Sequence, residues 1–284
     1  MRGEHAVGGG MSKQRLMPGG GGGGAWLGGP KTASSEKWGG ANKMSSTIAD
    51  GLSAAIVEEG ATGTSIFDPV LCELAYRWFS PSRGNILDPF AGGSVRGIVA
   101  SHLGRKHHGC ELRAEQVAAN TAQAGIAKAP LPVWVCDDSR NIAKHYAPEM
   151  DFLFSCPPYA DLEVYSDDPR DLSAMDYPAF VAAYREIIVA SCSLLKDNRF
   201  ACFVVGDVRD KKGNYRNFVG DTVEAFRAAG MHYYNEAILI TAVGSLPIRV
   251  GKQFAASRKL GKTHQNILVF VKGDGKKAAA ACSA

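Results

Sequence analysis

The residues of this sequence best placed to do chemistry form the run Ser-Cys-Pro-Pro-Tyr at positions 155–159. The apolar segment that leads into it, Asp151–Ser155, predicts a buried strand. Two consecutive prolines end a strand ladder and hold the backbone rigidly, which is useful where a carbonyl must be aimed at a proton of a substrate. The candidate catalytic residues are therefore Ser155, Cys156, Pro157, Pro158 and Tyr159.

A second candidate site lies earlier in the chain, where the predicted strand Asn85–Asp88 runs into a glycine-containing turn. Small residues there let a ligand approach the backbone, and the N-terminus of the helix that follows offers N–H groups to an anionic group. The turn has no lysine and lacks the G-x-G-x-x-G pattern, which excludes a P-loop and a nicotinamide site. A carboxylate at Asp88 suits a ligand that carries an ammonium group and little phosphate.

Carboxylates also end the next two predicted strands. Glu111 is placed where an acid can accept both hydroxyls of a ribose, and Asp138 where a carboxylate can accept from an adenine amino group. Ligands of doubly wound sheets bind outside the carboxyl ends of the strands. Acids on three successive strand ends therefore favour a ligand that contains adenosine.

The turn Asp-Pro-Phe-Ala-Gly-Gly-Ser, followed by Cys-Glu-Leu and then Asp-Asp-Ser, resembles motifs I to III of the amino-group DNA methyltransferases, which bind S-adenosylmethionine. Residues 65–71 resemble the motif that precedes motif I and lines the methionine end of the cofactor. The resemblance implies a cofactor site formed by Phe67, Asp88, Phe90, Ala91, Gly92, Gly93, Ser94, Glu111, Asp137 and Asp138. Asp137 stands where the family usually has glycine, so the choice between Asp137 and Asp138 as the adenine contact is open.

Residues 156–159 resemble motif IV of the same family, (Asp/Asn/Ser)-Pro-Pro-(Tyr/Phe/Trp). In the family the first side chain and the first proline's carbonyl accept the hydrogens of an exocyclic amine, while the aromatic ring stacks on the extruded base. Cys156 departs from the pattern because a thiol is a poor acceptor. Three interpretations are open: Ser155 supplies a hydroxyl, Cys156 accepts weakly beside a dominant Pro157 carbonyl, or Cys156 is a nucleophile. Adenine and cytosine are both open as targets.

Two basic segments are the candidates for phosphate contacts. The connection between the last two predicted strands has no acidic residue from Thr241 through Gly273, and Asp207–Arg216 places further basic residues around Tyr215. We expect both segments to bind nucleic acid with an affinity that falls as salt rises. The predicted contacts are Arg209, Lys211, Lys212, Arg249, Lys252, Arg258, Lys259 and Lys262. The acidic segment Asp161–Asp176 is expected to fold over the cofactor or to pair with the basic connection.

The elements that position these residues alternate between short apolar runs and stretches of helical periodicity. Strands are predicted at 85–88, 107–111, 133–136, 151–155, 199–205, 234–241 and 266–271. Helices are predicted at 94–103, 113–124, 177–195 and 221–229. Repeated β–α units predict an α/β, Rossmann-like, mostly parallel doubly wound sheet, and the resemblance implies its methyltransferase version. The last two strands have no helical pattern between them and are expected to pair as an antiparallel hairpin.

The chain has 284 residues, of which 45% are hydrophobic and 21% charged, with a formal net charge of +4. We expect a disordered glycine-rich tail at 1–60, one catalytic domain at 61–274 and a frayed end at 275–284. Scattered cysteines without a C-x-x-C pair exclude a disulfide framework or a zinc knuckle and suit a reducing cytosol. No apolar stretch is long enough to cross a bilayer, so a cytoplasmic location is expected, in a bacterium or a phage-infected host.

Together these features predict a site-specific DNA methyltransferase that transfers a methyl group from S-adenosylmethionine to the N4 amine of cytosine or the N6 amine of adenine. The resemblance covers residues 64–273. Members of the family often carry a separate target-recognition domain, none is evident here, and this compact build resembles the orphan enzymes of phages and prophages. Two alternatives are open: an RNA methyltransferase that modifies a guanine amine, and a nucleic-acid- or cofactor-binding protein whose Cys156 marks a lost active site.

Overall fold

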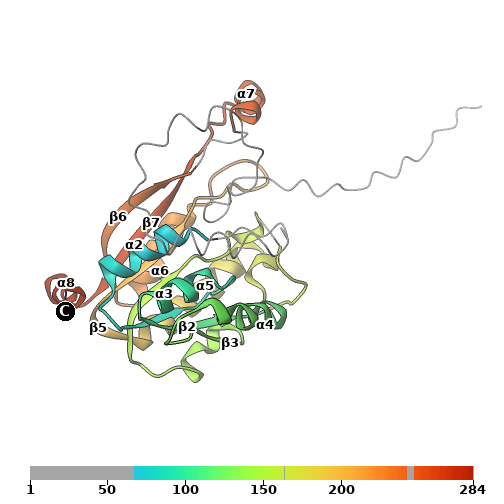
Figure 1. Cartoon of the computed structure of the whole chain (residues 1–284). Helices are drawn as coiled ribbons and strands as arrows, with labels where there is room; N and C mark the ends of the chain where they lie inside the picture. The colour runs from blue at the N-terminus through green and yellow to red at the C-terminus, as the bar shows by residue number, and fades with distance from the viewer. Residues whose placement is uncertain (1–66, 163, 242–245, 284) are drawn as a thin grey trace, which may run out of the picture. The chain divides into compact units, whose positions relative to one another are not determined.

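The computed structural model of the chain describes residues 67–162, 164–241 and 246–283 (Figure 1). The predicted glycine-rich tail lies outside these residues. Internal contacts divide the chain into two units, and residues 243–261 belong to the smaller one. The larger unit contains the sheet and both candidate turns. Each unit is described by itself below.

The larger unit is built from the β–α units that the hydrophobic pattern predicts. Its strands are β1 (Asn85–Asp88), β2 (Lys106–Glu111), β3 (Val133–Cys136), β4 (Met150–Ser155), β5 (Leu195–Val205), β6 (His232–Ile240) and β7 (His264–Lys272). Its α-helices are α2 (Pro69–Phe79), α3 (Val95–His102), α4 (Ala114–Gln123), α5 (Tyr177–Leu194), α6 (Phe218–Ala228) and α8 (Gly275–Cys282). Short 3-10 helices are η2 (Ala124–Ile126), η3 (Ser139–Lys144), η4 (Ala160–Leu162) and η5 (Leu172–Ala174).

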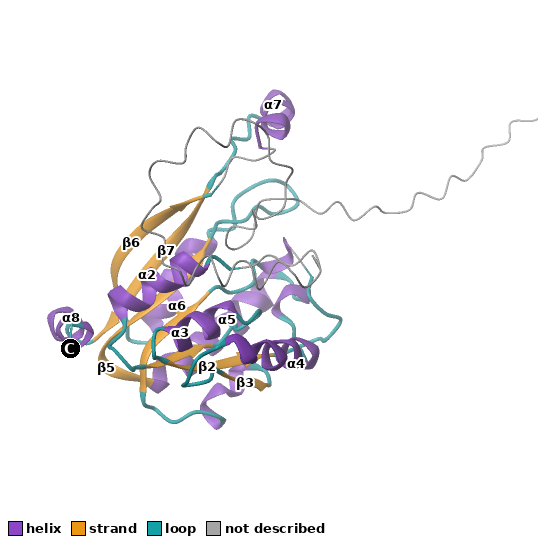
Figure 2. Cartoon of the chain, viewed as in Figure 1, coloured by secondary structure: helices purple, strands orange, loops and turns teal. Residues whose placement is uncertain are grey.

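All seven strands form one sheet in the order β3-β2-β1-β4-β5-β7-β6. The first five strands in this order are parallel, and β7 pairs antiparallel with both β5 and β6. Figure 2 shows these strands in orange, with helices on both sides. The chain proceeds from β1 outward to β3 and then returns to place β4 on the other side of β1, so the order reverses between β1 and β4. Ligands of doubly wound folds bind at such a reversal.

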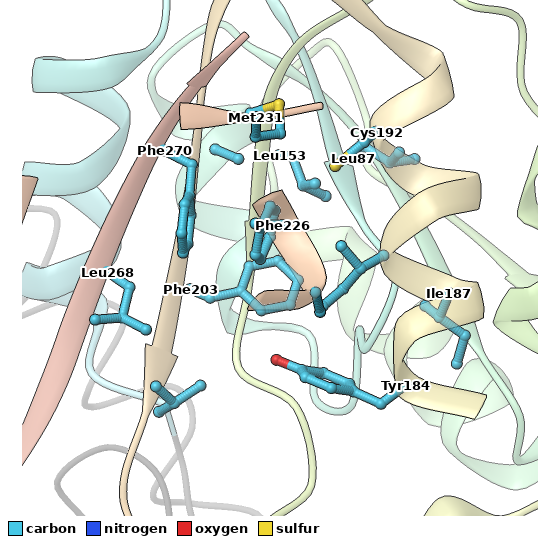
Figure 3. Packing of buried hydrophobic residues seen from close by; sticks show 14 of the residues in the cluster. Leu87, Leu153, Tyr184, Ile187, Cys192, Phe203, Phe226, Met231, Leu268 and Phe270 are labelled. Carbon is cyan, nitrogen blue, oxygen red and sulfur yellow. The ribbon is translucent and has the colours of Figure 1, made fainter. Parts of the chain in front are cut away.

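Alternate residues of the central strands point into two separate cores because successive side chains of a strand face opposite sides of the sheet. On one face, α5 and α6 cover a core that contains Leu87, Leu153 and Phe203 (Figure 3). On the other face, α2, α3 and α8 cover a core that contains Ile86 and Phe152. Both faces of the central strands are therefore buried, and their backbone is held rigidly beneath the two turns.

The predicted α/β fold and its antiparallel last pair of strands are confirmed, but three details are wrong. The helix α2 is absent from the predicted helices. A helix, α7 (Leu246–Ser257), lies in the connection that we expected to have no helical pattern. Its Leu246, Val250 and Phe254 recur every four residues, a period that the glycines and serines around them obscured. The C-terminal segment is the helix α8 instead of a frayed end. The Asp274 side chain caps it by accepting from the Lys277 N–H at 2.8 Å, and its alanines are strong helix formers.

No helix within the described ranges combines the length and the apolar character that crossing a membrane requires.

Candidate active site

The two candidate turns lie side by side at the point where the strand order reverses. β1 and β4 pair in parallel, with Leu87 opposite Leu153, so their carboxyl ends reach the same edge of the sheet. One side chain joins the turns that follow: the Ser155 hydroxyl donates to Asp88 Oδ1 at 2.6 Å and accepts from the Phe90 N–H at 3.1 Å. The two candidate turns are therefore adjacent.

Side chains from neighbouring elements hold the backbone of the glycine turn and do not cover it. The Gly92 N–H donates to Glu111 Oε2 at 2.9 Å, and the Gly92 carbonyl accepts from Asn120 Nδ2 at 2.7 Å. Gly92 has a φ of +50°, a conformation that glycine adopts without strain. A Cβ atom added at Gly93 would meet no heavy atom of the described residues within 4 Å. Glu111 therefore fixes the turn and lies next to an open stretch of backbone.

Other predicted cofactor residues support the turn from below. The Phe90 ring packs against Tyr184 and Phe203 of the core, and Ala91 is fully buried. The Ser94 hydroxyl donates to Gln123 Oε1 at 2.5 Å and makes no capping bond to α3. The Ser94 side chain thus leaves the first N–H groups of α3 uncapped. Because these groups carry the positive end of the helix dipole, they can meet an anionic group.

Asp88 is buried beneath the turn and makes an ion pair that the sequence pattern did not reveal. Arg96, the second residue of α3, donates from Nε to Asp88 Oδ2 at 2.6 Å and from Nη2 to the carbonyls of Phe90 and Ala91. His107 Nε2 lies 3.4 Å from the same carboxylate oxygen. Burial alone would raise the pKa of Asp88, but Arg96 and His107 outweigh it and hold that pKa at about 2. Asp88 therefore anchors Arg96 and Ser155 inside the fold.

Phe67, predicted at the methionine end, lies behind this ion pair. Its ring is 4.7 Å from the Arg96 guanidinium carbon and meets Phe154 edge-to-face at 5.7 Å. The part of the preceding motif at residues 65 and 66 lies outside the described residues. A signal for Arg96 was available in its spacing: a basic residue two positions after Ser94 is placed to return to the acid that ends β1.

The two acids after β3 differ in their surroundings. The Asp138 carboxylate caps η3 by accepting from the Arg140 N–H at 2.9 Å, and the Arg140 guanidinium binds the same carboxylate at 2.5 Å. The Asp137 carboxylate is more exposed and lies 2.7 Å from His145 Nε2, a hydrogen bond that lowers the pKa of Asp137. Ser139 donates to the Pro89 carbonyl at 2.5 Å, which ties this strand end to the glycine turn.

The acidic segment 161–176 lies beside these strand ends. The guanidinium carbon of Arg113, two residues after Glu111, is 5.9 Å from the Tyr165 ring centroid. Arg170 pairs with Asp168 at 2.6 Å, and the pKa of Arg170 is raised first by Asp168 and then by the charges of Asp138 and Asp137. These contacts place part of the segment beside the carboxyl ends of β2 and β3.

The Cys-Pro-Pro-Tyr turn has its side chains directed inward. Only 5% of Tyr159 is exposed; its ring meets Phe218 edge-to-face, and its hydroxyl accepts from Gln265 Nε2 at 2.8 Å. Cys156 Sγ lies 3.9 Å from Tyr159 Oη. Burial raises the pKa of the Cys156 thiol, although Arg96 opposes this effect. A thiol that stays protonated is a poor nucleophile, which disfavours the nucleophilic interpretation. Gln265 was not among the predicted site residues, because its position on β7 is distant in sequence from the turn.

The predicted phosphate contacts fall into both units. Residues 207–216, hereafter the basic hairpin, follow β5 and carry Arg209, Lys211 and Lys212, all exposed. Lys262 belongs to the larger unit; burial lowers the pKa of its ammonium group, and the charge of Asp207 in the basic hairpin opposes this effect. The remaining contacts, Arg249, Lys252, Arg258 and Lys259, belong to residues 243–261, with Arg249 and Lys252 on α7. In the part of the chain that the structure describes, no group of three or more His, Cys, Asp or Glu side chains is arranged to hold a metal ion.

Comparisons with known proteins bear on the fold. No protein-family model matches the chain. No curated protein matches it in sequence. Solved structures do resemble it. The [4+2]-cyclase SpnF aligns with a TM-score of 0.50 and 14% identity over 73% of this chain and 82% of SpnF.

Two further structures come from named organisms. A protein described as a SAM-dependent methyltransferase from Methanosarcina mazei aligns with a TM-score of 0.49 and 10% identity over 70% of this chain and 97% of that one. TrmN from Thermus thermophilus aligns with a TM-score of 0.46 and 12% identity over 72% of this chain, which spans only 48% of TrmN. Likeness at such identities concerns the fold alone. The chain has a Rossmann-like α/β fold, a mostly parallel sheet with two antiparallel C-terminal strands.

Proposed function

We propose that this chain is an S-adenosylmethionine-dependent methyltransferase that modifies the exocyclic amine of a base in DNA. The observation that carries the proposal is the contact between the two turns, in which Ser155 bonds to both Asp88 and the Phe90 N–H. This contact puts the glycine turn next to the Cys-Pro-Pro-Tyr turn at the strand-order reversal. A methyl donor and an amine acceptor would have to meet at such a place.

The glycine turn fits the cofactor in three respects. Open space above Gly93 admits a ligand close to the backbone, and the N–H groups of α3 that lack a side-chain cap suit the carboxylate of a methionine group. Glu111 Oε1 accepts from the Arg113 N–H and from Arg113 Nε, whereas Oε2 accepts only from the Gly92 N–H among the described residues and, since a carboxylate oxygen can accept twice, can take a ribose hydroxyl. Bound there, S-adenosylmethionine would supply an electrophilic methyl group. Asp137, the more exposed of the two acids after β3, is the better candidate to meet adenine.

On the base side, the geometry favours the backbone over the side chains. Ser155 is fully buried, and its hydroxyl already donates to Asp88 and accepts from Phe90. Cys156 offers a weak, protonated acceptor. We therefore assign the orientation of the amine to the Pro157 carbonyl, with Cys156 beside it. The test below distinguishes the N4 amine of cytosine from the N6 amine of adenine as the target.

Tyr159 is proposed to act differently from what motif IV implies. Its ring is buried against Phe218, and Gln265 holds its hydroxyl, so in this conformation it supports the turn and presents no face to an extruded base. The basic hairpin and Lys262 are proposed to hold the phosphates of the DNA, as are the basic residues of 243–261.

The direct test is incubation of the full chain with methyl-labelled S-adenosylmethionine and duplex DNA, single-stranded DNA or structured RNA, followed by mass spectrometry of the nucleosides. Label on the N4 amine of cytosine or the N6 amine of adenine in DNA is the expected result. Label confined to a guanine amine in RNA would reassign the substrate. Tight cofactor binding without transfer to any nucleic acid would overturn catalysis and identify a binding protein.

A further inference from the structure

The basic hairpin begins next to the candidate active site. β5 pairs in parallel with β4, with Phe203 opposite Ser155, so the hairpin leaves the sheet at the edge where Cys156 follows β4. A Cβ atom added at Gly206, the residue before the hairpin, would lie 3.9 Å from the Tyr159 ring. The root of the hairpin therefore touches the Cys-Pro-Pro-Tyr turn.

Internal hydrogen bonds give the hairpin a defined shape. The Asp210 N–H donates to the Asn214 carbonyl at 2.8 Å, the Gly213 N–H donates to the Asp210 carbonyl at 2.9 Å, and Gly213 has a φ of +94°. The Asn214 N–H donates to the Asp210 carboxylate at 2.8 Å, which occupies the acid within the turn. The Arg216 N–H closes the base by donating to the Val208 carbonyl at 2.9 Å. The cations on this loop thus stand on a structured support.

The exposed surface of the hairpin is a planar stack. Arg209 and Tyr215 face each other across an isolated antiparallel bridge, and the Arg209 guanidinium carbon lies 3.8 Å from the Tyr215 ring centroid. Arg209 Nη1 donates to the Gly213 carbonyl at 2.8 Å, so the guanidinium plane is held in place. Tyr215 is 47% exposed. Lys211 and Lys212 project from the tip between them.

This combination matches the chemistry of an unstacked nucleic-acid strand. Exposed bases stack on tyrosine rings and on guanidinium planes without needing a particular sequence, while lysines contact the phosphates beside them. Because Tyr159 is buried, it leaves this stacking role to another group near the site. A base paired within a duplex presents no free face to such a platform.

We propose that the Arg209–Tyr215 stack is a platform for the base that neighbours the modified one, and that the protein therefore binds single-stranded or locally opened strands in preference to intact duplex. Lys211 and Lys212 hold the phosphates of that strand. This inference rests on the proposed function, because it assumes that nucleic acid is the substrate.

The test measures binding of a fluorescent single-stranded oligodeoxynucleotide and of the matching duplex by anisotropy over a range of salt concentrations. Tyr215→Ala is expected to weaken single-strand binding about 10-fold and to leave its salt dependence unchanged. Tyr215→Phe, which keeps the ring, should bind like the wild type. Arg209→Lys, which keeps the charge and loses the plane, should weaken binding. The double variant Lys211→Gln, Lys212→Gln should instead reduce the slope of log affinity against log salt concentration, by about 0.7 for each lost phosphate contact.

Matched controls are available at the opposite edge of the sheet. Tyr234 is 46% exposed and lies against Gly275 at the start of α8, and Lys106 is exposed at the start of β2. Tyr234→Ala and Lys106→Gln should bind single strands like the wild type. Equal affinity of Tyr215→Ala and Tyr234→Ala, or tighter binding of duplex than of single strand by the wild type, would overturn the platform.

The nucleoside assay separates this failure from failure of the proposed function. If the wild type methylates a base amine but Tyr215→Ala binds normally, the platform is wrong and the function stands. If the wild type neither binds nor methylates any nucleic acid, both are wrong. Thermal unfolding of each variant should stay at the wild-type temperature, since the replaced side chains are exposed; a matching loss of stability would assign Tyr215 to folding instead.

Discussion

The two turns at the strand-order reversal are held in opposite ways. In the glycine turn, side chains from β2 and α4 bond to the backbone of Gly92 and leave the space above Gly93 open. In the Cys-Pro-Pro-Tyr turn, the side chains themselves point inward, Ser155 to Asp88 and Tyr159 to Gln265. The first turn is thus ready to take a ligand, while the second offers a fixed backbone. Recognition of a base must then depend on the Pro157 carbonyl and on groups beyond the turn.

The largest effect is expected where the two turns share one residue. Asp88→Asn leaves the buried Arg96 without its charge partner, and breaking a buried ion pair in this way costs about 3–5 kcal/mol of the free energy of unfolding. Urea denaturation measures the loss. Asp168→Asn is the control, because its ion pair with Arg170 has the same 2.6 Å length but is exposed, and it should change stability far less. Equal losses in the two variants would show that burial of Asp88 is unimportant.

Lowering the pH should destabilise the contact between the two turns, because it protonates Asp88. The pKa of Asp88 is about 2 in the folded chain, below its usual value of about 3.9 in an unfolded one. A depressed pKa contributes stability above pH 4, and this contribution, about 2.6 kcal/mol, is lost as the pH falls from about 4 to 2. Urea titrations at several pH values test this. In Asp88→Asn the part of the acid sensitivity that belongs to Asp88 should vanish; an unchanged pH profile would contradict the assignment.

The glycine turn alone should respond to Glu111→Gln. Replacing the carboxylate weakens the hydrogen bonds it can accept from a ribose, so affinity for S-adenosylmethionine should fall about 10-fold while oligonucleotide binding is retained. Isothermal titration calorimetry measures the first and anisotropy the second. Glu115→Gln removes an acid from the same region, on α4 and 73% exposed at its side chain, and should leave both affinities intact. A parallel loss in both variants would point to general electrostatics.

The smallest effect should come from the support beneath the second turn. Gln265→Leu removes the donor to the Tyr159 hydroxyl and should destabilise the protein by about 1 kcal/mol. Because the turn loses its support, methyl transfer should slow while the affinity for S-adenosylmethionine stays the same. Tyr159→Phe should act in the same direction. The double variant should lose less than the sum of the two, as expected of residues in contact; strict additivity would separate Gln265 from the turn.

Local pattern was sufficient for much of this arrangement. The strand Asn85–Asp88 has the predicted ends, and α5 begins at the predicted Tyr177, because apolar periodicity and capping residues act over a few positions. The helices α2, α7 and α8 escaped prediction. Glycines and serines hid the short period of α7. The helix α8 depends on one capping residue, Asp274, and on burial of Ala278 against the rest of the fold.

By itself, the sequence determined which strands form, that an acid ends or closely follows each of the first three, and that a diproline follows the fourth. Those features arise from residues close together in the chain. Only the tertiary structure decided what the side chains do there. Arg96 forms an ion pair with Asp88. Ser155 bonds to Asp88, 67 positions earlier in the sequence, and Gln265 bonds to Tyr159, 106 positions earlier. Polar groups removed from water must find partners, and those partners are set by which strands adjoin in the sheet, a property that no local pattern contains.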